Sequence, residues 1–198
     1  MKRIFAIIVL LCFSLSVKSQ LLSSGQLEEQ QLYISLSEAL KNPEKVYRLD
    51  LSKQKLHNIP KEVFSLYNLQ ELNLAKNKLA YIPQEISNLT NLQKLNVSKN
   101  DLTELPSSIG ILTNLTELIA NQNDIYKLPA EIGNLINLEN LDLWSTSVDV
   151  FPDEISKLKD TLKKLDLRVV LINEDRQKAI VDLLPNTFIY FSKSCNCH

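Results

Sequence analysis

A stretch of 23 residues, Leu69 to Asn91, recurs along most of this chain and limits what it can fold into. A fixed period of this length is typical of a solenoid, in which each unit buries its apolar face only against its neighbours. We therefore expect residues 46–172 to form six stacked coils that share one continuous core. The six copies of the pattern LxxLxLxxNxLxxIPxxIxxLxx begin at Val46, Leu69, Leu92, Leu115, Leu138 and Leu162.

The second copy shows how each coil is expected to fold. Leu72 and Leu74 point inward from a short strand, while Asn73 between them points outward. Asn77 then enters the core, where its amide can pair with backbone groups of neighbouring coils, because an unpaired buried polar group costs about 1–3 kcal/mol. Pro83 favours an irregular or 3₁₀ return path over a long helix. The asparagine ladder continues at Asn100 and Asn123 and is interrupted at Gln54 and Thr146.

This pattern resembles the leucine-rich repeat superfamily in its 23-residue class, over about two thirds of the chain. The resemblance implies an α/β fold: a right-handed horseshoe with a concave parallel β-sheet and an irregular or 3₁₀ convex side. The lack of flanking disulfide caps makes the chain more similar to secreted bacterial members than to secreted animal ones. Because members of this family usually bind partners on the concave face, the resemblance implies a protein-binding module.

The first nineteen residues differ in composition from the rest. Two basic residues precede an apolar run over 4–15, and residues 17–19 suit a cleavage site before Gln20. This is the pattern of a secretory signal peptide, and the run is shorter than the ~20 residues that span a bilayer. An uncleaved membrane anchor is the alternative. We assign 1–19 to a signal peptide and expect a secreted protein, extracellular, periplasmic or at the cell surface, without a membrane span in the mature chain.

Both ends of the repeat array are predicted to carry caps, because an open end would expose the core. Before the array, Ser35-Leu-Ser-Glu38 matches a helix capping box. After it, Asn173 suits a helix N-cap, and residues 187–191 are rich in strand formers. We therefore divide the remaining chain into 20–45 as a mobile lead-in and N-terminal cap helix, 173–191 as a C-terminal cap of a helix plus a strand, and 192–198 as a polar tail.

The outward positions of the predicted strands are mostly small or polar, with Ile119 and Trp144 as exceptions in adjacent coils. A tryptophan near an arginine is typical of a binding hot spot. Alternatively, Trp144 packs over the gap left by Ala120 and binds nothing, and both interpretations stay open. A column of Lys53, Lys76 and Lys99 is interpreted as a solvated face. The candidate partner-binding residues, called the concave patch below, are Asn96, Ile119, Asn121, Asp142, Trp144, Asp166 and Arg168.

Residues for catalysis are scarce. The two histidines are His57 and His198, and neither a nucleophile elbow, a zinc-protease motif nor a phosphate loop is present. We predict a non-enzyme without cofactor or metal. A net charge of −1 leaves no basic excess for nucleic acid. Cys195-Asn-Cys197-His198 falls short of a four-coordinate zinc site, so a free tail or local disulfide is preferred over an intermolecular disulfide, and both over a metal.

These observations predict a secreted, monomeric module that binds a protein, or less readily a glycan, on its concave face. An intracellular signalling scaffold, similar to the Ras-associated members of the same repeat class, is the first alternative. A thiol- or metal-handling protein that uses the C-terminal tail is the second.

Overall fold

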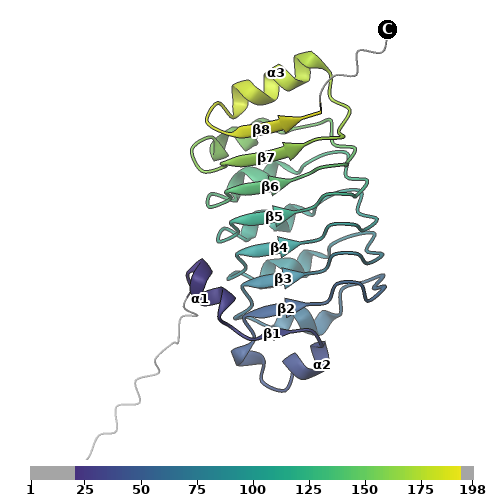
Figure 1. Cartoon of the computed structure of the whole chain (residues 1–198), viewed down its shortest axis with the longest axis vertical. Helices are drawn as coiled ribbons and strands as arrows, with labels where there is room; N and C mark the ends of the chain where they lie inside the picture. Colours follow the sequence, from purple (N-terminus) through teal and green to yellow (C-terminus); the bar gives the residue numbers. More distant parts are fainter. Residues whose placement is uncertain (1–20, 193–198) are drawn as a thin grey trace, which may run out of the picture.

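Eight parallel strands stack in chain order into one open sheet in the computed structural model, which describes residues 21–192 (Figure 1). The predicted signal peptide and the tail from residue 193 lie outside the described residues. The predicted solenoid with a parallel sheet is confirmed. The strands are β1 (Leu32–Tyr33), β2 (Arg48–Asp50), β3 (Glu71–Asn73), β4 (Lys94–Asn96), β5 (Glu117–Ile119), β6 (Asn140–Asp142), β7 (Lys164–Leu167) and β8 (Phe188–Phe191).

The return path of each coil is a short 3₁₀ segment. Every one of these segments follows directly on a proline, whose fixed φ and missing N–H favour the start of a tight turn over a long helix. The predicted 3₁₀ convex side is therefore confirmed. The five segments are η2 (Lys61–Ser65), η3 (Gln84–Asn88), η4 (Ser107–Ile111), η5 (Ala130–Asn134) and η6 (Asp153–Leu158).

The strand register stacks equivalent leucines directly on one another. Leu72 pairs with Leu95, and Leu95 with Leu118, and each of these side chains is at most 1% exposed. Burying one such side chain stabilises the fold by about 1.5–3 kcal/mol. Since every coil contributes the same layer, the core runs without a break from the first coil to the last.

The predicted asparagine ladder forms inside this core. Asn77 donates from Nδ2 to the carbonyls of Leu51 in the preceding coil (2.9 Å) and Leu74 in its own coil (2.8 Å). Its Oδ1 accepts from two backbone N–H groups of the preceding coil, both at 3.0 Å. Asn100 and Asn123 donate in the same way, and the Oδ1 of each accepts from one backbone N–H of the preceding coil, so each amide ties two successive coils together.

The N-terminal segment differs from the mobile lead-in that we expected. It contains helix α1 (Ser24–Glu28), which begins at a capping box between Ser23 and Gln26. Leu27 of this helix is fully buried. The guanidinium of Arg48 in β2 donates to two backbone carbonyls at the end of the segment, at 3.0 and 3.5 Å. The segment is folded against the sheet because these contacts satisfy both its apolar and its polar groups.

The predicted cap helix is present as α2 (Leu36–Ala39) and is followed by η1 (Pro43–Lys45). The Ser35 hydroxyl accepts from the backbone N–H of Glu38 at 3.5 Å. The Glu38 carboxylate, however, pairs with Lys41 at 2.8 Å. Only half of the predicted capping box forms, because a lysine three residues later offers the carboxylate a charged partner.

The C-terminal end of the array is covered on the convex side by α3 (Glu174–Leu183). The Asn173 side chain caps its start by accepting from a backbone N–H. Ile180 and Leu184 bury their side chains in the core, and Arg176 pairs with Asp149 of the preceding coil at 2.6 Å. The chain then returns to the sheet as β8.

Candidate partner-binding face

The register of the sheet brings the concave patch together on one face. Asn96, Ile119, Asp142 and Asp166 pair with one another in this order across β4 to β7. Asn121, Trp144 and Arg168 follow two residues later, just beyond the ends of β5, β6 and β7. Side-chain bonds from Asn121 to Asp142 and from Arg168 to Asp166 hold this second row beside the first. The seven predicted residues therefore lie in two adjacent rows.

The most buried member of the patch is a carboxylate. Asp166 is 2% exposed and accepts from Arg168 at Nε (2.9 Å) and Nη2 (2.7 Å). Burial by itself raises the pKa of Asp166, but the hydrogen bonds and charge of Arg168, together with the charge of Lys164, leave this pKa below its ordinary value. The pair holds a guanidinium that is 56% exposed in a fixed position on the concave face.

A second carboxylate orients the residues around Trp144. Asp142 accepts from the Asn121 side chain at 2.6 Å and from the backbone N–H of Trp144 at 3.0 Å. Ile119 and Trp144 are each half-buried, so part of each side chain faces solvent. The face thus combines partly exposed apolar surface with donors and acceptors held by neighbouring strands.

Strand β8 adds two aromatic residues to this face that the sequence analysis did not identify. Phe188 pairs with Lys164 and is 75% exposed, and Tyr190 pairs with Asp166 and is 46% exposed. The Lys164 ammonium lies 5.3 Å from the centroid of the Tyr190 ring. The repeat pattern ends before β8, so the outward columns were followed only to the sixth coil. Alternate residues of a strand point to opposite faces of the sheet, and this alternation over 188–191 was the sequence signal that could have identified Phe188 and Tyr190.

The first strands of the sheet present charges that already have partners. Arg48 pairs with Glu71 at 2.7 Å, and Lys94 lies 3.8 Å from Glu28 of α1. Between β3 and β5 the sheet carries a shallow hollow of about 110 Å³, whose lining includes Asn96 and Ile119 of the concave patch. The N-terminal half of the face is therefore polar and internally paired, in contrast to the half around Trp144.

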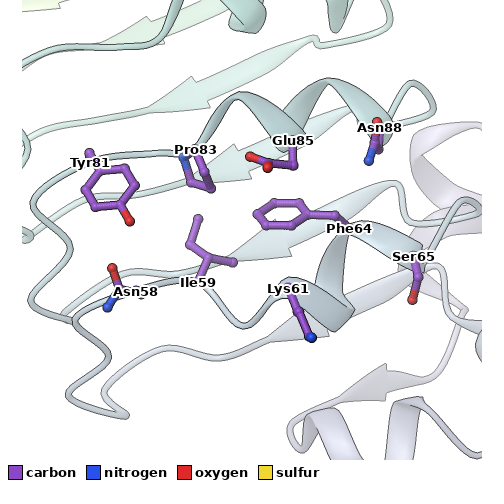
Figure 2. Close-up of a pocket in the computed structure, with 9 residues that line it drawn as sticks. All are labelled: Asn58, Ile59, Lys61, Phe64, Ser65, Tyr81, Pro83, Glu85 and Asn88. Atoms are coloured by element: carbon purple, nitrogen blue, oxygen red, sulfur yellow. The ribbon is translucent and has the colours of Figure 1, made fainter.

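A separate groove of about 350 Å³ lies on the convex side between η2 and η3 (Figure 2). Figure 2 shows the Phe64 ring directed between the two segments, near Ile59 and Pro83. At the position of Phe64 the later coils carry Ser87, Gly110, Gly133 and Ser156. The Phe64 ring is therefore larger than any side chain at the equivalent position of the later coils, and it lines the groove. The sequence analysis overlooked this groove, although the exception at Phe64 was visible in the repeat.

Metal-binding groups and membrane-spanning helices were sought among the described residues. Within residues 21–192, no group of three or more His, Cys, Asp or Glu side chains is placed to hold a metal ion. In the same range, no helix has the length and apolar character that crossing a membrane requires. Cys195, Cys197 and His198 lie outside the described residues.

Comparisons with solved structures identify similar solenoids. A leucine-rich repeat protein of Leptospira interrogans is 35% identical, with a TM-score of 0.68, covering 82% of this chain and 48% of that one. An internalin of Listeria monocytogenes shares the fold at 22% identity and a TM-score of 0.67, covering 81% and 45%. A plant peptide hormone receptor, RGFR1 in complex with RGF2, is 28% identical, with a TM-score of 0.63, covering 83% and 27%. The chain spans less than half the length of each.

The family assignment comes from a second comparison. No curated protein matches the chain. A family model described as a leucine-rich repeat region, however, matches residues 35–187, which is more than half of the chain. The protein therefore belongs to the leucine-rich repeat family.

Proposed function

We propose that this protein is a secreted recognition module that binds a polypeptide partner through the concave patch. The observation that carries the proposal is the partly exposed Ile119–Trp144 pair, set beside a guanidinium that the buried Asp166 holds in place. Binding hot spots combine a large aromatic residue, an arginine and a rigid support. Placement on a parallel sheet keeps these groups in position before the partner arrives, which lowers the entropy cost of binding.

A polypeptide suits this face better than a glycan. Beyond their bonds within the patch, the Asp142 carboxylate keeps accepting capacity, and the Asn121 amide and the Arg168 guanidinium keep N–H donors. The same face carries the half-buried Ile119 and Trp144. A peptide backbone supplies both donors and acceptors, and its side chains can cover Trp144. The plant peptide hormone receptor in complex with RGF2 is 28% identical to this chain. This likeness supports a peptide as the ligand that we propose here. A glycan partner would be revealed by the same experiment.

The experiment is capture of partners from extracellular and surface extracts by the wild-type chain and by Ile119→Asp/Trp144→Asp. Each aspartate places a charge where the partner would need apolar contact. We expect the variant to bind the captured partner at least about 30-fold more weakly, equivalent to about 2 kcal/mol at a hot spot. Circular dichroism and the urea midpoint verify that both proteins fold.

The matched control is Tyr67→Asp/Tyr81→Asp, which replaces two exposed tyrosines, each 55% exposed, outside the concave patch. This control should bind as wild type does. Loss of binding in the tyrosine variant alone would move the site to the convex groove of Figure 2, where Tyr81 lies. Equal binding by all three proteins would reject the concave patch, and loss of the partner after glycosidase treatment of the extract would identify a glycan.

Secretion is tested by sequencing the N-terminus of the protein recovered from its host. We expect it to begin at Gln20 and to be found outside the cytoplasm, because residues 1–19 have the composition of a signal peptide. A cytoplasmic protein that retains Met1 would reject secretion and favour the intracellular scaffold.

A further inference from the structure

Five lysines gather on the turns that follow β2, β3 and β4, and the last of them borders the concave patch, because the Lys99 N–H donates to the carbonyl of Asn121. All five are exposed. They form two rows, because each of the first two coils contributes two lysines and the third contributes one. This surface, called the lysine ridge below, consists of Lys53, Lys55, Lys76, Lys78 and Lys99.

The backbone of the ridge is fixed by bonds between coils. The N–H groups of Lys53, Lys76 and Lys99 each donate to a carbonyl of the next coil, at 3.0, 2.9 and 2.9 Å. Neighbouring strands of a sheet lie about 4.8 Å apart, so the three lysines of this row follow one another at the spacing of the coils. Only the side chains remain to be ordered when a ligand binds.

The fold does not require lysine at these positions. Lys53, Lys76 and Lys99 have φ between 56° and 60°, a left-handed conformation that glycine and asparagine adopt most readily. The later coils adopt nearly the same φ with Gln122 and Ser145. The turn therefore tolerates several residue types, and its geometry does not explain the lysines.

Ion pairing does not explain them either. No lysine of the ridge takes part in a salt bridge within residues 21–192. Elsewhere in the same range, Lys94, Lys127 and Lys163 each pair with a glutamate. Five like charges on a fixed backbone repel one another until an anion covers them.

We propose that the lysine ridge, which adjoins the concave patch at Lys99, binds a linear acidic polysaccharide. A polymer with one carboxylate or sulfate on each sugar ring presents charge at regular intervals, as the ridge does. Its stiff chain loses little conformational entropy on binding. The attraction is electrostatic, so it weakens as salt screens the charges.

Other anions fit the ridge less well. In an extended acidic peptide, side chains on the same face repeat every two residues, about 6.6–6.8 Å apart, so its carboxylates fall out of step with coils spaced about 4.8 Å apart. An anionic membrane presents a broad surface, whereas the ridge is a narrow strip: one row spans three coils, and the other spans two coils and is followed by Asp101 in the third. A linear polyanion with closely spaced charges matches both the width and the length of this strip.

The test measures binding of the full chain to immobilised polygalacturonate at about 50 mM and about 200 mM sodium chloride, since counterion release makes such binding salt-dependent. The variant is Lys53→Gln/Lys76→Gln/Lys99→Gln, which leaves the core untouched because all three side chains are exposed. We expect binding to weaken about tenfold or more at the lower salt and the salt dependence to become shallower.

The matched control, Lys45→Gln/Lys157→Gln/Lys178→Gln, removes the same charge from exposed lysines outside the ridge. It should change binding by less than about twofold if position, and not net charge, matters. Equal weakening in both variants would overturn the proposal, as would no binding of wild type at the lower salt. Equal or tighter binding to polyglutamate or to vesicles of anionic phospholipid would replace the polysaccharide with that partner.

Discussion

The first and last coils share one backbone but present opposite surfaces. The turn residue after each strand changes along the array from Lys53, Lys76 and Lys99 to Gln122, Ser145 and Val169, while φ stays between 52° and 60° throughout. The backbone conformation belongs to the repeat, whereas the side chain is free to vary. A solenoid of this kind can therefore place a cationic surface at one end and an apolar surface at the other without altering its core.

The two ends also differ in how they protect apolar side chains. At the N-terminal end Leu27 of α1 is fully buried, although it lies outside the repeats. At the C-terminal end Phe188 is 75% exposed and Leu171 is 98% exposed. Of these three side chains only Leu27 is covered by folded chain, although exposed apolar side chains also occur near the N-terminus, such as Ile34 at 71%. Truncation of Leu27 and truncation of Phe188 should therefore lower the free energy of unfolding by unequal amounts.

Truncation of Leu27 is expected to have the largest effect. Leu27→Ala should lower the free energy of unfolding by about 2–5 kcal/mol, because it removes a fully buried side chain. Phe188→Ala removes more atoms but should cost less than about 1 kcal/mol, because most of its ring is exposed. Urea unfolding of both variants measures the difference. A larger loss of unfolding free energy in Phe188→Ala than in Leu27→Ala would contradict this comparison.

Glycine substitutions compare the packing of the convex side with that of α1. A Cβ at Gly133 would overlap the carbonyl oxygen of Glu154, so Gly133→Ala should destabilise the fold by about 1–3 kcal/mol through overpacking. A Cβ at Gly25 would meet no atom within 4 Å, and Gly25→Ala should stabilise by about 0.4–1 kcal/mol by restricting the unfolded chain. The same chemical change should shift the thermal midpoint in opposite directions. Equal shifts would contradict this comparison.

The repeat explains why so much of the interior was predictable. Each leucine of the pattern occupies the same place in every coil, so six copies specify the strands, the register and the ladder of Asn77, Asn100 and Asn123 together. A second asparagine ladder could also have been predicted from the repeat, but the sequence analysis overlooked it. The residue before each of the second to fifth coils is an asparagine that donates to a backbone carbonyl 24 residues earlier at 2.6–2.8 Å: Asn68, Asn91, Asn114 and Asn137.

Features outside the repeat were harder to predict, because their contacts link distant parts of the chain. Leu27 belongs to no repeat position, and nothing in its neighbours indicates that α1 folds back toward Arg48 and Lys94. Phe188 and Tyr190 continue the outward rows only because β8 adds in register to β7. The rows of the concave patch were predictable from the period, whereas the hydrogen bonds of Asp166 and Asp142 depend on side-chain positions that a pattern does not contain.

A substitution that removes a buried charge tests the comparison at the C-terminal end. Asp166→Asn should lower the free energy of unfolding by about 1 kcal/mol at neutral pH, because the buried group keeps one acceptor but loses its charge opposite Arg168. The pKa of the wild-type carboxyl is lower in the folded state than its ordinary value of 3.8. Its contribution to stability is therefore fully present above that ordinary pKa and is lost as pH falls through the folded-state pKa.

The measurement is the difference in free energy of unfolding between wild type and Asp166→Asn across this pH range. The difference should be constant from neutral pH down to about pH 5 and should shrink below about pH 4. Arg168→Gln should reproduce most of the neutral-pH loss, and the double variant should lose less than the sum of the two, because both substitutions break one pair. A difference that stays constant below about pH 3 would mean that the charge on Asp166 contributes nothing. The exposed guanidinium of the concave patch would then lack the electrostatic support that the proposed binding site requires.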